Sequence, residues 1–418
     1  MDKYVIDGGK RLCGSVAVQS AKNSVLPLFA ASILTDKRVV IRDVPEISDV
    51  VCMAQILREL GANVRLCGGN VAIESSDACC HVISSSLTKE LRSSVFMLGS
   101  LLTRFRRALI AYPGGCDIGL RPIDLHLNSL KRLGVRISER DGFIVCECDT
   151  LHGAEISLDF PSVGATENIL LAAVKADGKT VLTGAAKEPE IVDLQNFLNA
   201  MGAKVRGAGT DVIEIEGVKE LHGVVYRPIR DRIEAGTYLI AAADCGGEVE
   251  VVGVSPENLR LLLHKLRENG CKIHTKNDKI RLESRGRLKC NRRIETMPFP
   301  GFPTDLQAQM TALNASCEGC ALVVENLFET RFKYVPELQK MGADIEVRGR
   351  SAFVRGVKKL HGASVVAGDL RGGAALVIAA LGAEGVSEVL DLSHIDRGYA
   401  DFNGKLKSLG ADVRRVCI

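Results

Sequence analysis

The stretch Leu198-Asn199-Ala200-Met201-Gly202-Ala203-Lys204-Val205 decides the fold, because its pattern returns six times along the chain. The pattern is Leu-x-x-φ-Gly-x-x-φ, where φ is an apolar residue, and the fourth copy has Asn269 before its glycine. The repeated glycines are separated by 73, 68, 68, 72 and 68 residues: Gly61, Gly134, Gly202, Gly270, Gly342 and Gly410. Six units of this size nearly exhaust the 418 residues, so no large unrelated domain is expected.

One repeat is expected to have the order βαβαββ, as the periodicity of the third unit indicates. Its elements are an opening strand after Leu151-His152-Gly153, a helix over 168–175, a strand over 180–182, a helix ending at Gly202, and strands over 204–206 and 212–215. The glycine supplies the left-handed cap that other residues adopt at a cost.

The N-terminus is predicted to complete the last repeat, which ends at Ile418 without a closing strand. Residues 3–7 form an unassigned strand pattern, and we expect residues 1 to about 20 to form a hairpin that stays with the C-terminal half. The sequence therefore predicts two lobes of three repeats, one over 22–229 and one over 1–21 and 230–418. A cleft between two such lobes is a natural ligand site.

Composition limits the possible functions. An apolar fraction of 46% supports two cores, and a formal charge of +3 gives no reason to expect nucleic acid. Arg104, Arg106 and Arg107 are interpreted as a solvated loop. No signal-peptide pattern or apolar run of ~20 residues is present, so we expect no membrane insertion. Fourteen cysteines without framework spacing favour a reducing cytoplasm.

Several motifs are better explained by the repeat than by chemistry. Cys317-x-x-Cys320 falls at a helix-to-strand turn, and Gly178-Lys179-Thr180 lacks the earlier glycine of a phosphate loop. His152, His222 and His361 occupy one repeat position and are expected to be structural. We therefore predict no metal and no cofactor.

The loop Pro113-Gly114-Gly115-Cys116-Asp117-Ile118-Gly119-Leu120-Arg121-Pro122-Ile123-Asp124 interrupts the repeat. A helix is predicted to begin at Pro122. Cys116 is expected to be exposed on this loop. An incidental cysteine is the simpler explanation, but the glycines and the nearby Arg121 favour a reactive thiol.

Charged residues recur at the entrances of predicted helices. Arg121, Arg331 and Arg397 lie 13, 11 and 13 residues before their repeat glycines. The preceding helix entrances carry Lys22, Arg92, Asp305 and Arg371. Any one of them alone is better explained as a surface ion pair, but their recurrence predicts a ring of cations with one carboxylate, suited to a polyanionic ligand.

With these residues in view, the chain resembles the UDP-N-acetylglucosamine 1-carboxyvinyltransferase family over essentially its whole length. The resemblance is carried by residues 20–23, the 113–124 loop, and residues 162–166, 302–305, 329–332, 369–371 and 394–399. It implies a two-lobed inside-out α/β barrel with three βαβαββ repeats per lobe. It also implies transfer of the enolpyruvyl group of phosphoenolpyruvate to the 3′-hydroxyl of UDP-N-acetylglucosamine.

The resemblance also implies roles for individual residues. Cys116 matches the acid that protonates the methylene carbon and forms a covalent adduct, and Asp305 matches the acceptor of the hydroxyl proton. Positions around phosphoenolpyruvate match Lys22, Arg121 and Arg397, with Arg331 and Arg371 nearby. Sugar-nucleotide or shared contacts match Asn23, Arg92, Pro122, Ile123, Asp124, Leu125, Ser162, Val163, Gly164, Asp305 and Leu327. Phe160 stands where some members have lysine, so a charge contact to the diphosphate from that position is not expected.

Two alternatives differ in class. A 5-enolpyruvylshikimate-3-phosphate synthase shares the fold and phosphoenolpyruvate but lacks the cysteine loop, so Cys116 argues against it. The second alternative is a catalytically idle relative that binds a sugar nucleotide or a protein. The presence of Lys22, Cys116, Asp305 and Arg397 argues against this alternative.

Overall fold

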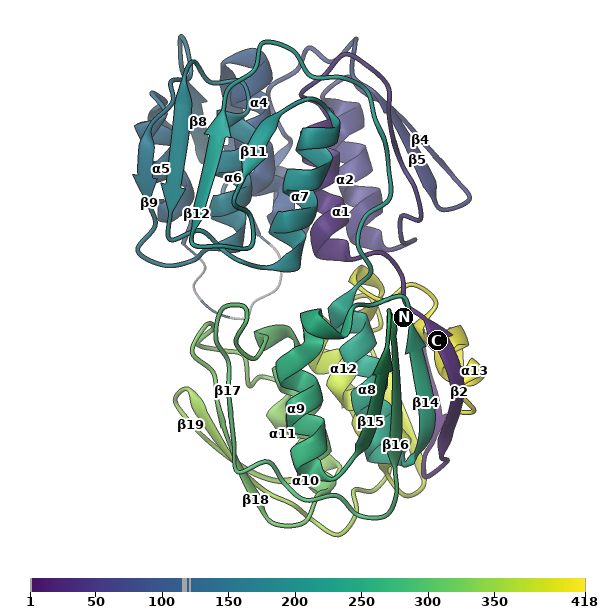
Figure 1. The fold of residues 1–418 in the computed structure, drawn as a ribbon. Helices are drawn as coiled ribbons and strands as arrows, with labels where there is room; N and C mark the ends of the chain where they lie inside the picture. The colour runs from purple at the N-terminus through teal and green to yellow at the C-terminus, as the bar shows by residue number, and fades with distance from the viewer. Residues whose placement is uncertain (1, 115–118, 120–121, 418) are drawn as a thin grey trace. The chain divides into compact units, whose positions relative to one another are not determined.

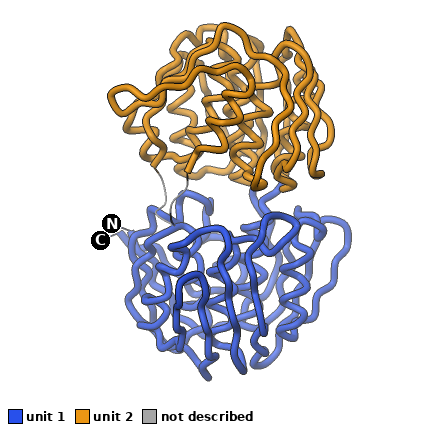
Figure 2. Tube along the Cα trace, turned by 90° about the vertical axis from the view of Figure 1, so that its left-hand side faces the viewer, with its two compact units in different colours: residues 1–19, 117–121, 230–418 blue, residues 20–116, 122–229 orange. Residues whose placement is uncertain are grey.

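A computed structural model describes residues 2–114, 119 and 122–417 as an α/β protein. Its internal contacts divide the chain into two units (Figure 2). Unit 1 comprises residues 1–19, 117–121 and 230–418, and unit 2 comprises residues 20–116 and 122–229. Cys116 and Arg121 lie outside the described residues. None of the helices in the described part of the chain has the length and apolar character needed to cross a membrane.

Unit 1 contains three four-stranded sheets, with strand orders β15-β16-β14-β2, β17-β18-β20-β19 and β21-β22-β1-β23. Its elements are β1 (Asp2–Asp7), β2 (Leu12–Ala17), α8 (Arg232–Cys245), β14 (Gly247–Val252), η2 (Pro256–Leu259), α9 (Arg260–Asn269), β15 (Lys272–Lys276), β16 (Lys279–Ser284), β17 (Arg293–Glu295), η3 (Thr304–Leu306), α10 (Gln307–Ser316), β18 (Cys320–Val324), α11 (Val335–Lys340), β19 (Asp344–Arg348), β20 (Ser351–Arg355), β21 (Ser364–Val366), α12 (Leu370–Gly382), β22 (Val386–Leu390), η4 (Ile395–Arg397), α13 (Phe402–Ser408) and β23 (Asp412–Cys417).

Unit 2 contains the sheets β13-β3-β5-β4, β6-β8-β7 and β11-β12-β10-β9. Its elements are α1 (Lys22–Ser32), β3 (Val39–Ile41), α2 (Ser48–Glu59), β4 (Asn63–Cys67), β5 (Asn70–Glu74), α3 (Ser85–Glu90), η1 (Arg92–Phe96), α4 (Met97–Phe105), β6 (Arg107–Ala111), α5 (Asp124–Arg132), β7 (Arg136–Arg140), β8 (Phe143–Glu147), β9 (Glu155–Ser157), α6 (Val163–Ala173), β10 (Lys179–Thr183), α7 (Pro189–Ala200), β11 (Lys204–Arg206), β12 (Val212–Glu216) and β13 (Val225–Tyr226).

Three helices form the interior of each unit, and the sheets lie outside them (Figure 1). These helices are α8, α10 and α12 in unit 1, and α1, α4 and α6 in unit 2. They are buried nearly all round because their sequences are apolar or small nearly all round, as in LRGGAALVIAALG of α12. Helices such as α9, RLLLHKLREN, bury one face only, through Leu262, Leu263 and Leu266.

The repeated glycines have the predicted left-handed conformation. Their φ angles are 97°, 96°, 98°, 108°, 90° and 93° in chain order. At Gly202 a Cβ would lie 2.9 Å from Cδ2 of His222, and His152 and His361 lie in the same way against their own repeat glycines. The three histidines therefore pack against their repeat glycines, which is consistent with the predicted structural role.

The predicted order of the third repeat is confirmed, with β9, α6, β10, α7, β11 and β12 in sequence. Helix α6 begins at Val163, five residues before the expected start, because Ser162 caps it: Ser162 Oγ accepts from the amide of Ala165 at 3.3 Å. Helix α5 begins at Asp124 and not at the predicted Pro122, since Ile123 has non-helical dihedrals (φ −109°, ψ 16°).

The predicted N-terminal hairpin is wrong, although β1 does complete the last repeat. Strand β1 pairs antiparallel with both β22 and β23, whereas β2 pairs parallel with β14 in another sheet. The reason is that β2 opens the fourth repeat, as β9 opens the third by pairing parallel with β10. The neighbouring strands β1 and β2 therefore belong to different repeats, the last and the fourth.

The solvated-loop interpretation of the arginine cluster is wrong for Arg104. This residue lies in the last turn of α4, and its guanidinium donates to the carbonyls of Ile33 and Ser75 at 3.0 and 2.5 Å. It also pairs with Asp36 at 2.7 Å. The side chain therefore joins three segments of unit 2.

Candidate functional site

The charged residues singled out in the sequence occupy entrances of the buried helices. Lys22 is the first residue of α1, and Arg92 is the first residue of η1, which leads into α4. Asp305 lies in η3 before α10, and Arg371 is the second residue of α12. The first turn of a helix carries unsatisfied amides, which favour anions.

In unit 1, Asp305 is held by two buried arginines. Its Oδ1 lies 3.0 Å from Nη2 of Arg331, and its Oδ2 lies 2.9 Å from Nη2 of Arg371. The Arg331 and Arg371 side chains are only 3% and 5% exposed, whereas the Asp305 side chain is 26% exposed. Each carboxylate oxygen is therefore fixed by its own guanidinium, and the carboxylate remains accessible.

Arg371 connects Asp305 to the segment that carries Arg397. Its Nη1 donates to Oη of Tyr399 at 3.3 Å, and Asp369 caps α12 by accepting from the amide of Arg371 at 3.0 Å. Burial disfavours the charge of Arg371, but Asp305 and Tyr399 raise its pKa above the ordinary value, so the guanidinium stays charged.

Arg397 ends η4 and has a partly buried side chain. The residues around it are anchored separately. Asp396 accepts two hydrogen bonds from Arg415, at 2.9 and 2.8 Å. Tyr399 hydrogen-bonds Thr237 at 2.9 Å. The backbone that presents Arg397 is thus held on both sides.

Leu327 joins the same region through Glu325. The buried carboxylate of Glu325 accepts from the amide of Leu327 at 2.9 Å and from Oγ1 of Thr304 at 2.9 Å. Thr304 directly precedes Asp305. The structure therefore brings Leu327 to the segment that holds the predicted base.

In unit 2, Lys22 pairs with a residue that the sequence did not single out. Its Nζ lies 2.5 Å from Oδ2 of Asp49, and their side chains are 12% and 6% exposed. Asp49 is in the first turn of α2. Sequence reasoning missed it because an acidic residue in a first turn already has a local explanation.

The start of α1 is anchored by Asp193. This buried carboxylate accepts from Ser24 Oγ, from Tyr226 Oη at 2.7 Å, and from the amide of Ile229 at 3.2 Å. Burial raises the pKa of Asp193, and these donors oppose that shift. Asn23, beside Ser24, is exposed.

Arg92 lies at the described base of the Cys116 loop. Its Nη1 is 3.4 Å from the carbonyl of Pro113, and the amide of Gly114 donates to the carbonyl of Thr88 at 3.0 Å. A Cβ on Gly114 would meet the carbonyl of Lys89 at 2.2 Å, so the backbone at Gly114 packs closely against α3.

Helices α5 and α6 are in contact, and their entrances carry the predicted residues Pro122, Ile123, Asp124, Leu125, Ser162, Val163 and Gly164. A Cβ on Gly164 would lie 2.9 Å from Cε1 of His126. His126 Nδ1 is 2.9 Å from Nδ2 of Asn168, which also donates to the carbonyl of Val95. Two helix N-termini therefore lie side by side in unit 2.

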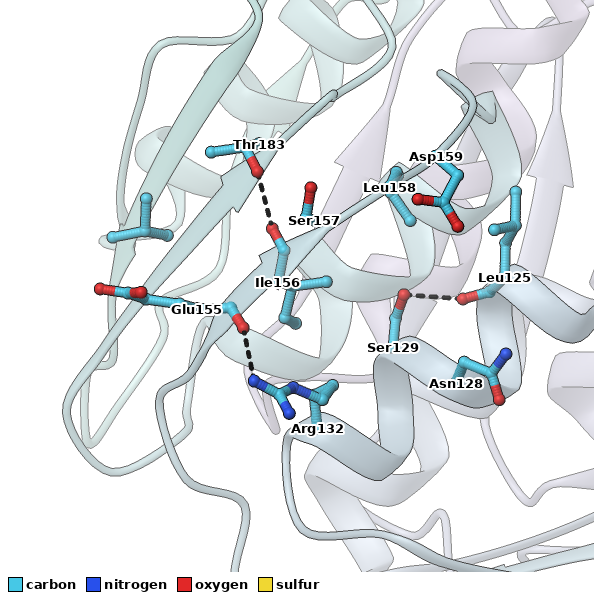
Figure 3. A pocket seen from close by; sticks show the side chains of 11 residues that line it. Leu125, Asn128, Ser129, Arg132, Glu155, Ile156, Ser157, Leu158, Asp159 and Thr183 are labelled. Carbon is cyan, nitrogen blue, oxygen red and sulfur yellow. Dashed lines mark hydrogen bonds between the residues drawn. The ribbon is translucent and has the colours of Figure 1, made fainter.

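A pocket of about 510 Å³ lies beside α5 and β9 (Figure 3). Leu125, Ser129 and Arg132 of α5 line it together with Glu155 of β9 and Asp159, and Arg132 donates to the carbonyl of Glu155 at 3.5 Å. Of the predicted site residues, Leu125 alone is among the described residues that line it. The pocket thus adjoins the α5 entrance but does not contain the charged cluster.

Comparison with known proteins places this geometry in a family. The chain matches the family model of EPSP synthase (3-phosphoshikimate 1-carboxyvinyltransferase) over residues 6–406. It is 53% identical over 416 residues to UDP-N-acetylglucosamine 1-carboxyvinyltransferase 2 of Caldanaerobacter subterraneus subsp. tengcongensis, with 100% of each chain covered. It is 50% identical over 418 residues to the protein of the same name from Carboxydothermus hydrogenoformans, again with 100% of each chain covered.

Solved structures agree with this placement. The enolpyruvyl transferase NikO from Streptomyces tendae is similar with a TM-score of 0.87 and 25% identity, over 99% of each chain. EPSP synthase from Acinetobacter baumannii has a TM-score of 0.76 at 18% identity, over 100% of each chain, which supports likeness of fold alone. The fold is that of the enolpyruvyl transferases. The chain belongs to the UDP-N-acetylglucosamine 1-carboxyvinyltransferase family within that class.

Proposed function

We propose that this protein transfers the enolpyruvyl group of phosphoenolpyruvate to the 3′-hydroxyl of UDP-N-acetylglucosamine and releases phosphate. This is the first committed step of bacterial peptidoglycan synthesis. The observation that carries the proposal is the identity of about half of all residues, over the whole chain, to proteins named for this activity.

The reaction needs an acid and a base. The sugar hydroxyl oxygen bonds to C2 of phosphoenolpyruvate while C3 receives a proton, which gives a tetrahedral adduct. The bond from C2 to the phosphate oxygen then breaks and C3 loses a proton, which restores the double bond. We assign Cys116 as the acid and Asp305 as the base.

The contacts of Asp305 suit the role of general base, because they fix the orientation of its carboxylate. Arg331 and Arg371 pair with its carboxylate and fix both oxygens, while its partial exposure leaves room for a hydroxyl. The hydroxyl proton should transfer as the C–O bond forms, because protonation at C3 makes C2 electrophilic.

Phosphoenolpyruvate carries a phosphate and a carboxylate, and fixed cations stabilise the departing phosphate. We propose that Lys22, Arg121 and Arg397 bind these groups, with Arg331 and Arg371 acting through Asp305. Lys22 then exchanges or shares its contact with Asp49 when an anion binds.

The sugar nucleotide is assigned to the neighbouring helix entrances. The N-termini of α5 and α6 offer amides suited to a diphosphate. The proposed contacts are Asn23, Arg92, Pro122, Ile123, Asp124, Leu125, Ser162, Val163, Gly164, Asp305 and Leu327. Phe160 is 45% exposed and supplies no charge at its position.

The remaining proposals concern organisation and setting. Each unit is proposed to be an inside-out α/β barrel of three βαβαββ repeats. Residues 22–229 and residues 1–21 with 230–418 are proposed as the functional lobes. The reaction as written uses no metal or cofactor, and the proposed compartment is the cytoplasm.

Phosphate release tests the function. With phosphoenolpyruvate present, release should depend on UDP-N-acetylglucosamine and should be lost in Cys116→Ala. Release driven instead by shikimate 3-phosphate would establish the EPSP synthase activity, and no turnover with either acceptor would establish a catalytically idle relative. Retained activity in Cys116→Asp would separate proton donation from adduct formation, because a carboxylic acid donates a proton without forming the stable thiol adduct.

A further inference from the structure

Gln19 is a buried residue of unit 1 with all its polar groups in use. It follows β2 and is 8% exposed. Its side-chain Nε2 donates to the carbonyl of Gly398 at 2.8 Å, and its Oε1 accepts from the amide of Ala400 at 2.9 Å. These two bonds define the orientation of the carboxamide, since exchanging its N and O would place donor against donor and acceptor against acceptor.

The backbone of Gln19 is fixed equally well. Its amide donates to Oε2 of Glu234 at 2.7 Å, and its carbonyl accepts from the amide of Asp231 at 2.8 Å. Glu234 is fully buried, and its Oε1 is 2.6 Å from Nζ of Lys405. Burial raises the pKa of Glu234 to about 7, against the opposing effect of Lys405.

The carboxamide of Gln19 bonds Gly398 and Ala400, which belong to the turn that follows Arg397. Gly398 packs closely against the start of α12, since a Cβ there would lie 2.8 Å from Cδ2 of Leu370. The Gln19 side chain hydrogen-bonds the backbone of the turn after Arg397 at two points. Arg415 donates a hydrogen bond to Asp396, the residue that precedes Arg397 in the chain.

We propose that Gln19 is a positioning residue for Arg397, so that its carboxamide sets the direction in which the guanidinium meets the phosphate of phosphoenolpyruvate. The inference rests on the proposed function. Gln19 touches neither substrate in this account; it acts through the backbone of Gly398 and Ala400. Its effect should therefore be confined to the substrate that Arg397 binds.

The test compares Gln19→Leu and Gln19→Glu with the wild-type enzyme. Leucine removes both side-chain bonds, and glutamate keeps the acceptor for Ala400 but loses the donor for Gly398. The expected result is a rise of about tenfold in KM for phosphoenolpyruvate in Gln19→Leu, a smaller rise in Gln19→Glu, and less than about a twofold change in KM for UDP-N-acetylglucosamine. Because glutamate is nearly isosteric, it keeps the proposal testable if the leucine variant does not fold.

The matched control is Gln339→Leu. Gln339 is also in unit 1 and also donates to a backbone carbonyl, that of Ile345 at 2.8 Å, but this bond joins α11 to β19 and does not involve the turn after Arg397. The control should leave both KM values within about twofold of the wild type. A parallel rise of both KM values in the Gln19 variants, or a loss of thermal stability with an unchanged KM for phosphoenolpyruvate, would overturn the proposal.

A binding experiment tests the role of Gln19 even if the proposed enzymatic function is wrong. If the wild-type protein does not turn over with UDP-N-acetylglucosamine, calorimetric binding of phosphoenolpyruvate alone still tests Gln19. Weaker binding by about tenfold in Gln19→Leu supports the positioning role, and equal binding in the two proteins rejects it.

Discussion

Asp305→Asn is predicted to lower both the stability and the turnover of the enzyme. The amide has the shape of the carboxylate but carries no charge. One of its two terminal atoms becomes an NH2 group that faces a guanidinium donor, Arg331 Nη2 at 3.0 Å or Arg371 Nη2 at 2.9 Å. Two buried cations lose their shared counter-ion.

The loss of stability can be estimated from these contacts. Removing one partner of a buried ion pair costs about 3–5 kcal/mol. The Asp305 side chain is 26% exposed, and each arginine keeps another acceptor, the carbonyl of Thr304 for Arg331 and the hydroxyl of Tyr399 for Arg371, both at 3.3 Å. We therefore expect the free energy of unfolding to fall by about 2–3 kcal/mol.

The loss of activity has a separate cause. A positioned general base contributes about 10²–10⁴-fold to the rate, so kcat for phosphate release should fall by at least about 100-fold in Asp305→Asn. The amide of asparagine cannot take up the hydroxyl proton. Phosphoenolpyruvate and UDP-N-acetylglucosamine should still bind, since the cations and helix entrances remain.

Urea denaturation and a continuous phosphate assay measure the two effects. The control is Asp344→Asn, which removes a surface pair with Arg355 at 3.1 Å whose side chains are 52% and 56% exposed. That change should cost at most about 1 kcal/mol and leave turnover intact. An Asp305→Asn enzyme as stable as the control would refute the role of the pair, and one within about tenfold of wild-type kcat would refute Asp305 as the base.

Three further predictions concern stability and positioning. Asp244 is partly buried, and its carboxylate accepts from Oγ of Ser316, the last residue of α10, at 2.5 Å. Burial of the carboxyl raises its pKa to about 7, so its neutral form stabilises the fold below about pH 4 and that stability is lost as the pH rises through 7. Asp244→Asn should therefore remove a decline of about 4 kcal/mol between pH 4 and pH 8 in the free energy of unfolding. Asp49→Asn should lower kcat/KM for phosphoenolpyruvate by about tenfold, because Lys22 loses its charged partner, and steady-state kinetics with each substrate varied will measure this. Gly202→Ala introduces left-handed backbone strain of about 1–2 kcal/mol and also a close contact between the new Cβ and His222. Gly178→Ala is the control, because its φ is also left-handed at 97° but no atom lies within 4 Å of the new Cβ. Urea denaturation should therefore show Gly202→Ala as the less stable variant.

Local chemistry explains which parts of the fold could be predicted from the sequence. A glycine that ends a helix in the left-handed conformation leaves a signature within a few residues, so Gly202 and its equivalents were recognisable. The same repeat located Lys22, Arg92, Asp305 and Arg371 at helix entrances. Cys317-x-x-Cys320 was correctly assigned to the turn between α10 and β18.

Long-range contacts explain what could not be predicted. The turn between β1 and β2 has no local feature that reveals their assignment to different sheets. The partner of Lys22 is 27 residues away in another helix, and Gln19 bonds Gly398, 379 residues away. Such contacts depend on how side chains reach between elements, which a periodic pattern does not record.

The most direct test of the addition–elimination chemistry is the product formed from phosphoenolpyruvate and UDP-N-acetylglucosamine in D2O, analysed by mass spectrometry and proton NMR. The proposed mechanism adds a solvent-derived deuteron to C3 and then removes one of the three hydrogens on that carbon. It therefore predicts an enolpyruvyl ether at the 3′-oxygen with deuterium in its vinyl group. A 3′-ether without vinyl deuterium would contradict the assigned acid and base, and the absence of any enolpyruvyl ether would contradict the function itself.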